Sequence, residues 1–63
     1  MPQITLKAAR VNAGFTQTKV AEKLGVSTST VKNWEQGKTF PKQPHIELLC
    51  ELYNVQYDQI FFK

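Results

Sequence analysis

Hydrophobic residues between positions 17 and 36 repeat with the period of two short helices that meet at one glycine. Val20, Ala21 and Leu24 are spaced so that they share one face of the first helix. Gly25 can adopt a positive φ without steric cost, so it is suited to end that helix and turn the chain. Val26 follows as an apolar anchor. The pattern therefore predicts two amphipathic helices joined by a tight turn.

The second of these helices begins after Ser27, which is a favourable N-cap residue, and it turns Val31 and Trp34 inward. Ala21 is small, and a small residue at that point lets two helices that cross steeply approach each other closely. Two amphipathic helices joined by so short a turn form a helix-turn-helix motif.

Three more helices are predicted on either side of this motif. Thr5 is a suitable cap for a first helix, and Gly14 is suited to end it. Pro44 fits the first turn of a fourth helix. Ile60 and Phe61 are apolar residues that a last short helix would add to the core. The inward side of the first helix is predicted to consist of Leu6, Ala9, Arg10 and Ala13.

Together these segments predict an all-α fold, a compact single domain over residues 1–63. Its five helices are expected to span residues 6–13, 17–24, 28–36, 44–53 and 57–62. A domain of this length buries only about 60% of the surface that its unfolded chain exposes, so its core is small.

The charge of the chain is unevenly divided along its length. Residues 1–43 contain seven basic and two acidic residues, a net charge of +5, whereas residues 44–63 carry a net charge of −2. The isoelectric point near 9.3 exceeds the value of about 9 that is typical of nucleic-acid-binding domains. A lysine-rich face is often only solvated, but here the basic charge coincides with the helix-turn-helix motif, which favours a nucleic-acid partner.

Composition argues against several other kinds of protein. One cysteine, Cys50, excludes an internal disulfide and is compatible with a reducing cytosol. Neither a signal peptide nor a stretch of ~20 apolar residues is present, so we expect a soluble, cytoplasmic protein. His45 and Cys50 lie on different faces of the fourth helix and cannot together build a zinc site or a nucleophile–base pair. We therefore expect no enzyme activity, no metal and no cofactor.

One face of the helix over residues 28–36 is predicted to point away from the core. At about 100° per residue, Val31, Trp34 and Glu35 fall on the buried side. The opposite side carries only hydrogen-bonding residues, none of them acidic, namely Ser29, Lys32, Asn33 and Gln36, with Thr28 at its edge. A helix that lies in the major groove of DNA requires such a face.

The chemistry of this face suggests contacts with bases. Asn33 can bind adenine through two hydrogen bonds, and Lys32 can donate to the O6 and N7 atoms of guanine. Thr28 and Ser29 can bond to several base edges. Two alternatives stay open: Thr28 and Ser29 could serve only the first turn of the helix, and Lys32 and Asn33 could form an ordinary solvated face.

The run TQTKVAEKLGVSTSTVKNWEQGK, residues 16–38, resembles the DNA-binding motif of the lambda-repressor and Cro-like helix-turn-helix proteins, the XRE-type transcriptional regulators. The matching residues are Gln17, Ala21, Gly25, Val31, Trp34, Glu35 and Gly37. The resemblance extends from Leu6 and Arg10 to the apolar segment 46–61, so it covers nearly the whole chain. It implies a lambda-repressor-like domain that binds double-stranded DNA through the helix over residues 28–36.

The resemblance also implies roles for individual residues. Arg10 is expected to form a structural ion pair with Glu35. Gln17 is expected to brace the recognition helix and approach the DNA backbone, where free N–H groups at the start of a helix favour a phosphate. Contacts with phosphates are further implied for Gln36, Lys38 and Thr39.

Family members commonly bind palindromic operators as homodimers, so we expect a homodimer at least on DNA. Tyr57 and Phe62 are the residues that we expect at the two-fold contact, with core packing as the alternative for Phe62. Phe40 stands where a more polar residue is usual, and its role is open. The resemblance suggests a phage or prophage-type repressor. An antitoxin or coactivator-like module that binds a protein partner with the same fold is the alternative.

Overall fold

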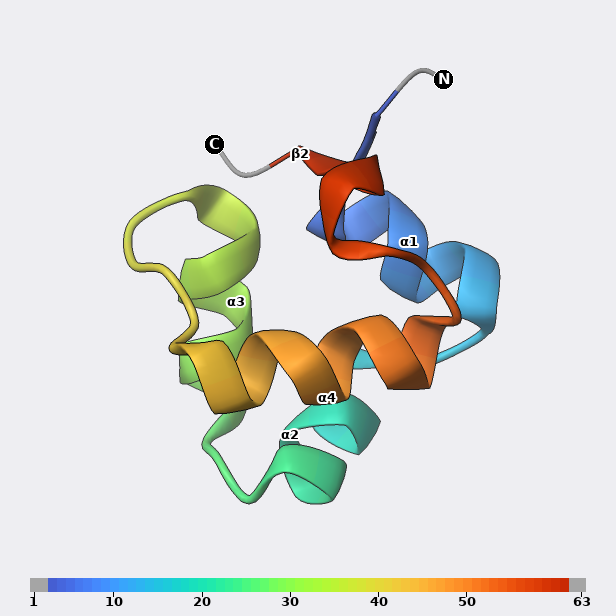
Figure 1. Cartoon of the computed structure of the whole chain (residues 1–63). Helices are drawn as coiled ribbons and strands as arrows, with labels where there is room; N and C mark the ends of the chain where they lie inside the picture. The colour runs from blue at the N-terminus through green and yellow to red at the C-terminus, as the bar shows by residue number, and fades with distance from the viewer. Residues whose placement is uncertain (1–2, 62–63) are drawn as a thin grey trace.

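The computed structural model describes residues 3–61 and contains four α-helices and two very short strands in that range. The elements follow in the order β1 (Ile4–Thr5), α1 (Leu6–Ala13), α2 (Gln17–Leu24), α3 (Thr28–Gln36), α4 (Gln43–Tyr53), the 3-10 helix η1 (Tyr57–Gln59) and β2 (Ile60–Phe61). Figure 1 shows α4 lying across the other three helices, with β1 and β2 together at one end of the molecule.

The bounds of the first three helices are the predicted ones, because side-chain caps and glycines set both ends of each helix. The capping hydroxyls of Thr5, Thr16 and Ser27 each accept a hydrogen bond at 3.1 Å from the backbone N–H three residues later. Each helix then ends at a glycine in the left-handed conformation. Local sequence signals of this kind act within one turn, so they can be read without knowledge of the tertiary structure.

The fourth helix begins one residue earlier than predicted. Gln43 is its first residue and Pro44 lies in its first turn, while Lys42 occupies the N-cap position without a side-chain hydrogen bond. It ends at Asn54, which adopts the left-handed conformation at φ 56°. Asparagine tolerates this region better than other residues with a side chain, which explains a helix end without a glycine.

The prediction of a fifth helix over residues 57–62 is wrong for the part that the structure describes. Only residues 57–59 form a single 3-10 turn, and β2 then pairs in parallel with β1, with Ile4 opposite Ile60 and Thr5 opposite Phe61. Successive residues of a strand point to opposite faces. Ile60 is therefore buried, whereas Phe61 is half exposed. The prediction for Phe62 lies outside the described residues.

The core lies between the four helices. Its largest fully buried side chains are Leu49, Val20 and Val31. Phe15, in the segment between α1 and α2, packs against Tyr53 with 6.3 Å between ring centroids. The prediction that Ala13 points inward is wrong, since this last residue of α1 is exposed. None of the helices within residues 3–61 has the length and apolar composition that a membrane crossing needs.

Candidate nucleic-acid interface

The turn between α2 and α3 sets the angle at which α3 leaves the domain. Gly25 has φ 72° and ψ 30°, and the N–H of Val26 donates to the carbonyl of Ala21 at 3.0 Å. A Cβ atom at position 25 would meet nothing within 4 Å. Glycine is therefore required by the backbone conformation and not by a lack of space. Val26 then packs against the core, and Ser27 caps α3.

The inner face of α3 is held by apolar contacts. Val31 and Trp34 are both buried, and the indole of Trp34 packs against the imidazole of His45 with 5.4 Å between ring centroids. His45 lies in the first turn of α4, so this contact joins α3 to α4. The position of α3 is thus fixed from behind over its middle turns.

A buried hydrogen-bond network fixes the last turn of α3. The Nε atom of Arg10 on α1 donates to Glu35 Oε2 at 2.6 Å, and Gln17 Nε2 at the start of α2 donates to Glu35 Oε1 at 2.9 Å. Arg10 also donates through Nη1 to the carbonyl of Phe15 at 2.8 Å. Only 4% of the Glu35 side chain is exposed and 11% of the Arg10 side chain. The carboxylate of Glu35 therefore ties α3 to both α1 and α2, and we call these three side chains the clamp.

Tyr53 lies beside the clamp, a position that sequence spacing did not reveal. Burial raises the pKa of the Tyr53 hydroxyl, and the negative charge of Glu35 raises it further, while the positive charge of Arg10 partly offsets this effect. The hydroxyl is buried and has no hydrogen-bond partner within the described part of the chain. The sequence signalled Tyr53 only as a core residue of α4, because its neighbour across the core belongs to a distant segment.

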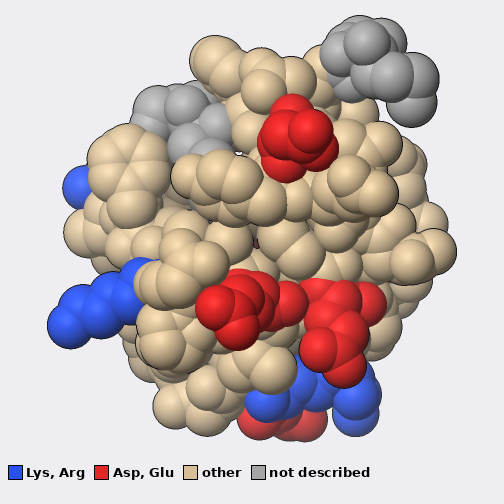
Figure 2. Space-filling model, viewed as in Figure 1, with Lys and Arg blue, Asp and Glu red and all other residues tan. Residues whose placement is uncertain are grey.

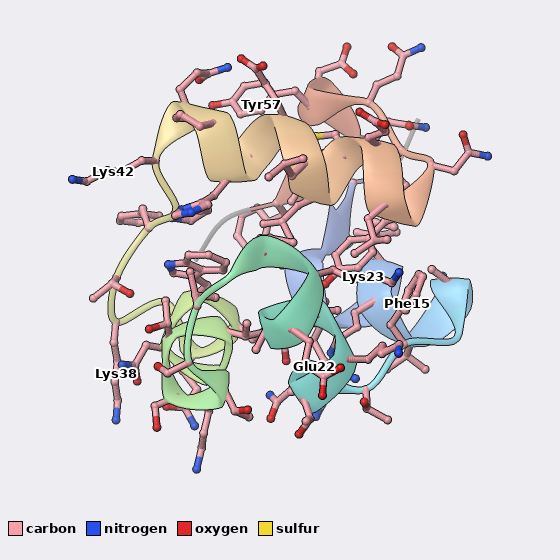
Figure 3. All side chains as sticks on the ribbon, turned by 90° about the horizontal axis from the view of Figure 1, so that it is seen from below. Phe15, Glu22, Lys23, Lys38, Lys42 and Tyr57 are labelled. Atoms are coloured by element: carbon pink, nitrogen blue, oxygen red, sulfur yellow. The ribbon has the colours of Figure 1, made fainter. Side chains whose placement is uncertain are left out.

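The outward face of α3 is polar, as the helical wheel places it. Thr28, Ser29, Lys32 and Gln36 are exposed, and Asn33 is half-buried. In Figure 3 the side chains of α3 extend from the edge of the molecule opposite α4, and Lys38 extends in the same direction. The structure therefore presents these side chains together on one side of the domain.

The remaining predicted contact residues occupy two different situations. Lys38 and Thr39 follow α3 directly and are exposed, and the N–H of Lys38 donates to the carbonyl of Asn33 at 3.0 Å. The side-chain amide of Gln17, in contrast, is engaged with Glu35. The side chain of Gln17 is therefore part of the clamp. Its backbone N–H, at the start of α2, is the group that can face a phosphate.

Phe40, whose role the sequence left open, is 62% exposed. It lines a shallow hollow together with Pro41, Ile46 and Tyr57, and Tyr57 is 59% exposed. The hollow is lined by side chains of the segment between α3 and α4, of α4 and of η1.

Several exposed acidic side chains gather on α4 and on the segment that follows it. The side that includes α4 displays the exposed acidic residues Glu47, Glu51 and Asp58, and Figure 2 shows acidic side chains across the middle of this face. On the side of α3, Lys32 and Lys38 are exposed and the carboxylate of Glu35 is neutralised inside the clamp. An approaching polyanion is therefore attracted to α3 and repelled by α4.

Among residues 3–61 there is no group of three histidine, cysteine, aspartate or glutamate side chains that could hold a metal ion. Cys50 is half-buried, and burial raises the pKa of its thiol above the usual range, which keeps it in the unreactive protonated form.

The turn, the clamp and the exposed polar helix together are the features of a helix-turn-helix domain, and the chain belongs to the helix-turn-helix family. The model of that family matches residues 6–60. Over 58 residues, 92% of this chain, the sequence is 38% identical to the HTH-type transcriptional regulator ImmR of Bacillus subtilis (strain 168). Over 55 residues, 87% of this chain, it is 29% identical to the HTH-type transcriptional activator BcrR of Enterococcus faecalis. The matched regions cover 46% and 27% of those two proteins, so the chain spans less than half the length of either relative.

Proposed function

We propose that this domain binds double-stranded DNA in a sequence-specific manner and regulates transcription, with α3 inserted in the major groove. The observation that carries the proposal is the exposed, acid-free polar face of α3, which the clamp and Trp34 hold outward from behind. Membership of the helix-turn-helix family and two relatives named as transcriptional regulators support it. The proposed target places the protein in the cytoplasm, and a phage or prophage-type repressor is the role that we propose.

Direct base contacts are assigned to the outward face of α3, on which Asn33 is half-buried and the other residues are exposed. Asn33 makes two hydrogen bonds to adenine, and Lys32 donates to guanine. Thr28 and Ser29 stand in the first turn, where the N-terminal end of a recognition helix meets the base edges. A bidentate contact contributes roughly 1–3 kcal/mol of discrimination between bases, so these residues set the preference of the domain.

Contacts with the phosphate backbone are assigned to residues at the two ends of the motif. Gln36, Lys38 and Thr39 lie at the end of α3 and directly after it, where side chains reach the strand beside the groove. At the other end, the backbone N–H of Gln17 points to the phosphate while its side chain holds Glu35. These contacts position the domain on the duplex without reading its sequence.

We further propose that two copies bind a palindromic operator, because one short helix reads only a half-site. Half-sites of such operators lie about 34 Å apart, and the domain measures 31 Å along its longest axis, so two adjacent copies fit this spacing. Tyr57, which is 59% exposed, is the described residue that we assign to this two-fold contact. The part that we assigned to Phe62 lies outside the described residues.

Selection of bound duplexes from a random pool tests this function directly. We expect a short two-fold symmetric sequence to be enriched, and the affinity for it to fall steeply as salt rises, because bound phosphates release counterions. A pool that shows no enrichment and no salt-dependent binding would overturn the proposal. Such a result would favour the protein-interaction module instead.

A further inference from the structure

A groove on the side of the domain away from α3 plays no part in the proposed DNA contact. It has a volume of about 280 Å³ and lies between the end of α2 and the second half of α4. Its lining consists of Lys23, Leu24, Leu48, Glu51 and Leu52. Leu48 is 45% exposed, whereas Leu24 and Leu52 are half-buried and pack against the core. An exposed leucine therefore stands beside an apolar hollow.

The two walls of this groove carry opposite charges. Lys23 belongs to α2 and points toward α4 in Figure 3, and Glu51 belongs to α4. Both side chains are exposed, and neither forms a salt bridge with another residue in the range 3–61. In Figure 2 acidic side chains lie across the middle of the face, and basic side chains lie at its lower edge together with a further acidic one. Both charges are thus available to a partner.

We propose that this groove binds the same groove of a second copy of the chain. The surface is complementary to itself, since it contains a projecting leucine, an apolar hollow, one positive wall and one negative wall. Suppose that the two-fold axis lies in the plane of the contact and is perpendicular to the line from Lys23 to Glu51. Each lysine then faces the glutamate of the other copy. Rotation about an axis along that line would place like charges together. The charges therefore select one of the two possible face-to-face arrangements.

The contact is weak in free solution because the domain is small. A stable interface usually covers about 800 Å² on each partner, which would be a fifth of the 4215 Å² that this chain exposes. Binding is strengthened when another contact already holds the two copies close together, because their effective concentration rises. No residue of α3 lines the groove, so the same molecule can use both surfaces. This contact would join neighbouring DNA-bound pairs, and it forms without DNA as well.

Charge reversal of the two walls gives a test with a distinctive result. Lys23→Glu and Glu51→Lys should each weaken self-association about tenfold, since two attractive pairs become repulsive in each dimer. When the two variants are mixed, every pair is again one lysine and one glutamate, so the mixture should form a heterodimer at least as stable as the wild-type contact. We would titrate ¹⁵N-labelled Glu51→Lys chain with unlabelled Lys23→Glu chain and follow the amide shifts of Leu24, Leu48 and Leu52.

Matched variants separate this contact from a general effect of charge. Lys19→Glu and Glu47→Lys make the same reversals on the same two helices but outside the groove, and mixing them should give shifts no larger than those of the wild type. Circular dichroism of each variant checks that it is folded. Three results would each overturn the proposal. The first is no amide shifts in the mixture of groove variants, and the second is shifts located outside the groove. The third is that the labelled Glu51→Lys chain shifts as much with wild-type chain as with the Lys23→Glu chain. All three can occur whether or not the domain binds DNA, so they are distinct from a failure of the proposed function.

Discussion

Replacement of Glu35 by glutamine tests whether the clamp determines the stability of this domain. The substitution keeps the shape of the side chain but removes the negative charge opposite Arg10, whose side chain is only 11% exposed. A charge left without its partner at a buried site costs roughly 3–5 kcal/mol. At ~0.05–0.15 kcal/mol per residue, a chain of this length has a free energy of unfolding of about 3–9 kcal/mol. Glu35→Gln should therefore remove about a third of the stability or more.

Urea denaturation followed by circular dichroism measures this loss. With a slope of about 1 kcal/mol per M for so small a protein, a loss of 3 kcal/mol lowers the midpoint by about 3 M. The double variant Arg10→Met with Glu35→Gln leaves no buried charge, so it should be more stable than the sum of the single effects predicts, with a coupling energy of about 2–3 kcal/mol. Glu47→Gln, on the exposed side of α4, is the control and should change stability by less than about 0.5 kcal/mol. Single effects below about 1 kcal/mol that simply add in the double variant would refute the reasoning.

Three further predictions concern other parts of the structure. Tyr53→Phe removes a buried hydroxyl without a partner, so the free energy of unfolding at neutral pH should stay constant or rise by up to about 1 kcal/mol. Because the pKa of Tyr53 is raised in the folded state, the wild type should lose stability as the pH rises above about 10, by up to about 1.4 kcal/mol per pH unit. The Tyr53→Phe variant should lack this contribution. If urea titrations at alkaline pH showed that both proteins lose stability equally with pH, this prediction would be wrong. Gly25→Ala should lower the free energy of unfolding by about 1 kcal/mol through backbone strain alone, since the Cβ of the introduced alanine meets no neighbour. An unchanged urea midpoint would show that the turn tolerates alanine. Asn33→Ala should relax the preference at one base pair in duplex selection, whereas Lys38→Ala should weaken all duplexes alike and reduce the salt slope by about 1; unchanged selection by Asn33→Ala would remove Asn33 from the reading face.

Most of the helical structure could be predicted because its signals are local. Thr5, Thr16 and Ser27 each act on an N–H three residues away, and the following glycines adopt the conformation for which they are suited. The last segment could not be predicted in this way. Its conformation depends on the pairing of Ile60 with Ile4, two residues at opposite ends of the chain, and a three-residue turn is too short to show a period.

The candidate site likewise has a part that local sequence signals predict and a part that depends on contacts between helices. Helical spacing alone was sufficient to place the polar side of α3 outward, because Val31 and Trp34 define the opposite side. The clamp depends on contacts between three helices, and in the sequence only the resemblance to a known family indicated the pair of Arg10 and Glu35. Neither spacing nor resemblance indicated that the charges of that pair act on the Tyr53 hydroxyl, since the residues come from three different helices.

The recognition helix uses separate side chains for its position and for its proposed reading of DNA. Val31, Trp34 and Glu35 hold it through apolar contacts and the clamp. The exposed side chains of Ser29 and Lys32 form no hydrogen bond with any residue of the described chain. A substitution on the exposed side therefore changes what the helix can contact without disturbing how it is held, since surface changes away from caps and buried groups alter stability little. This separation allows one scaffold to present different sets of polar side chains while the fold persists.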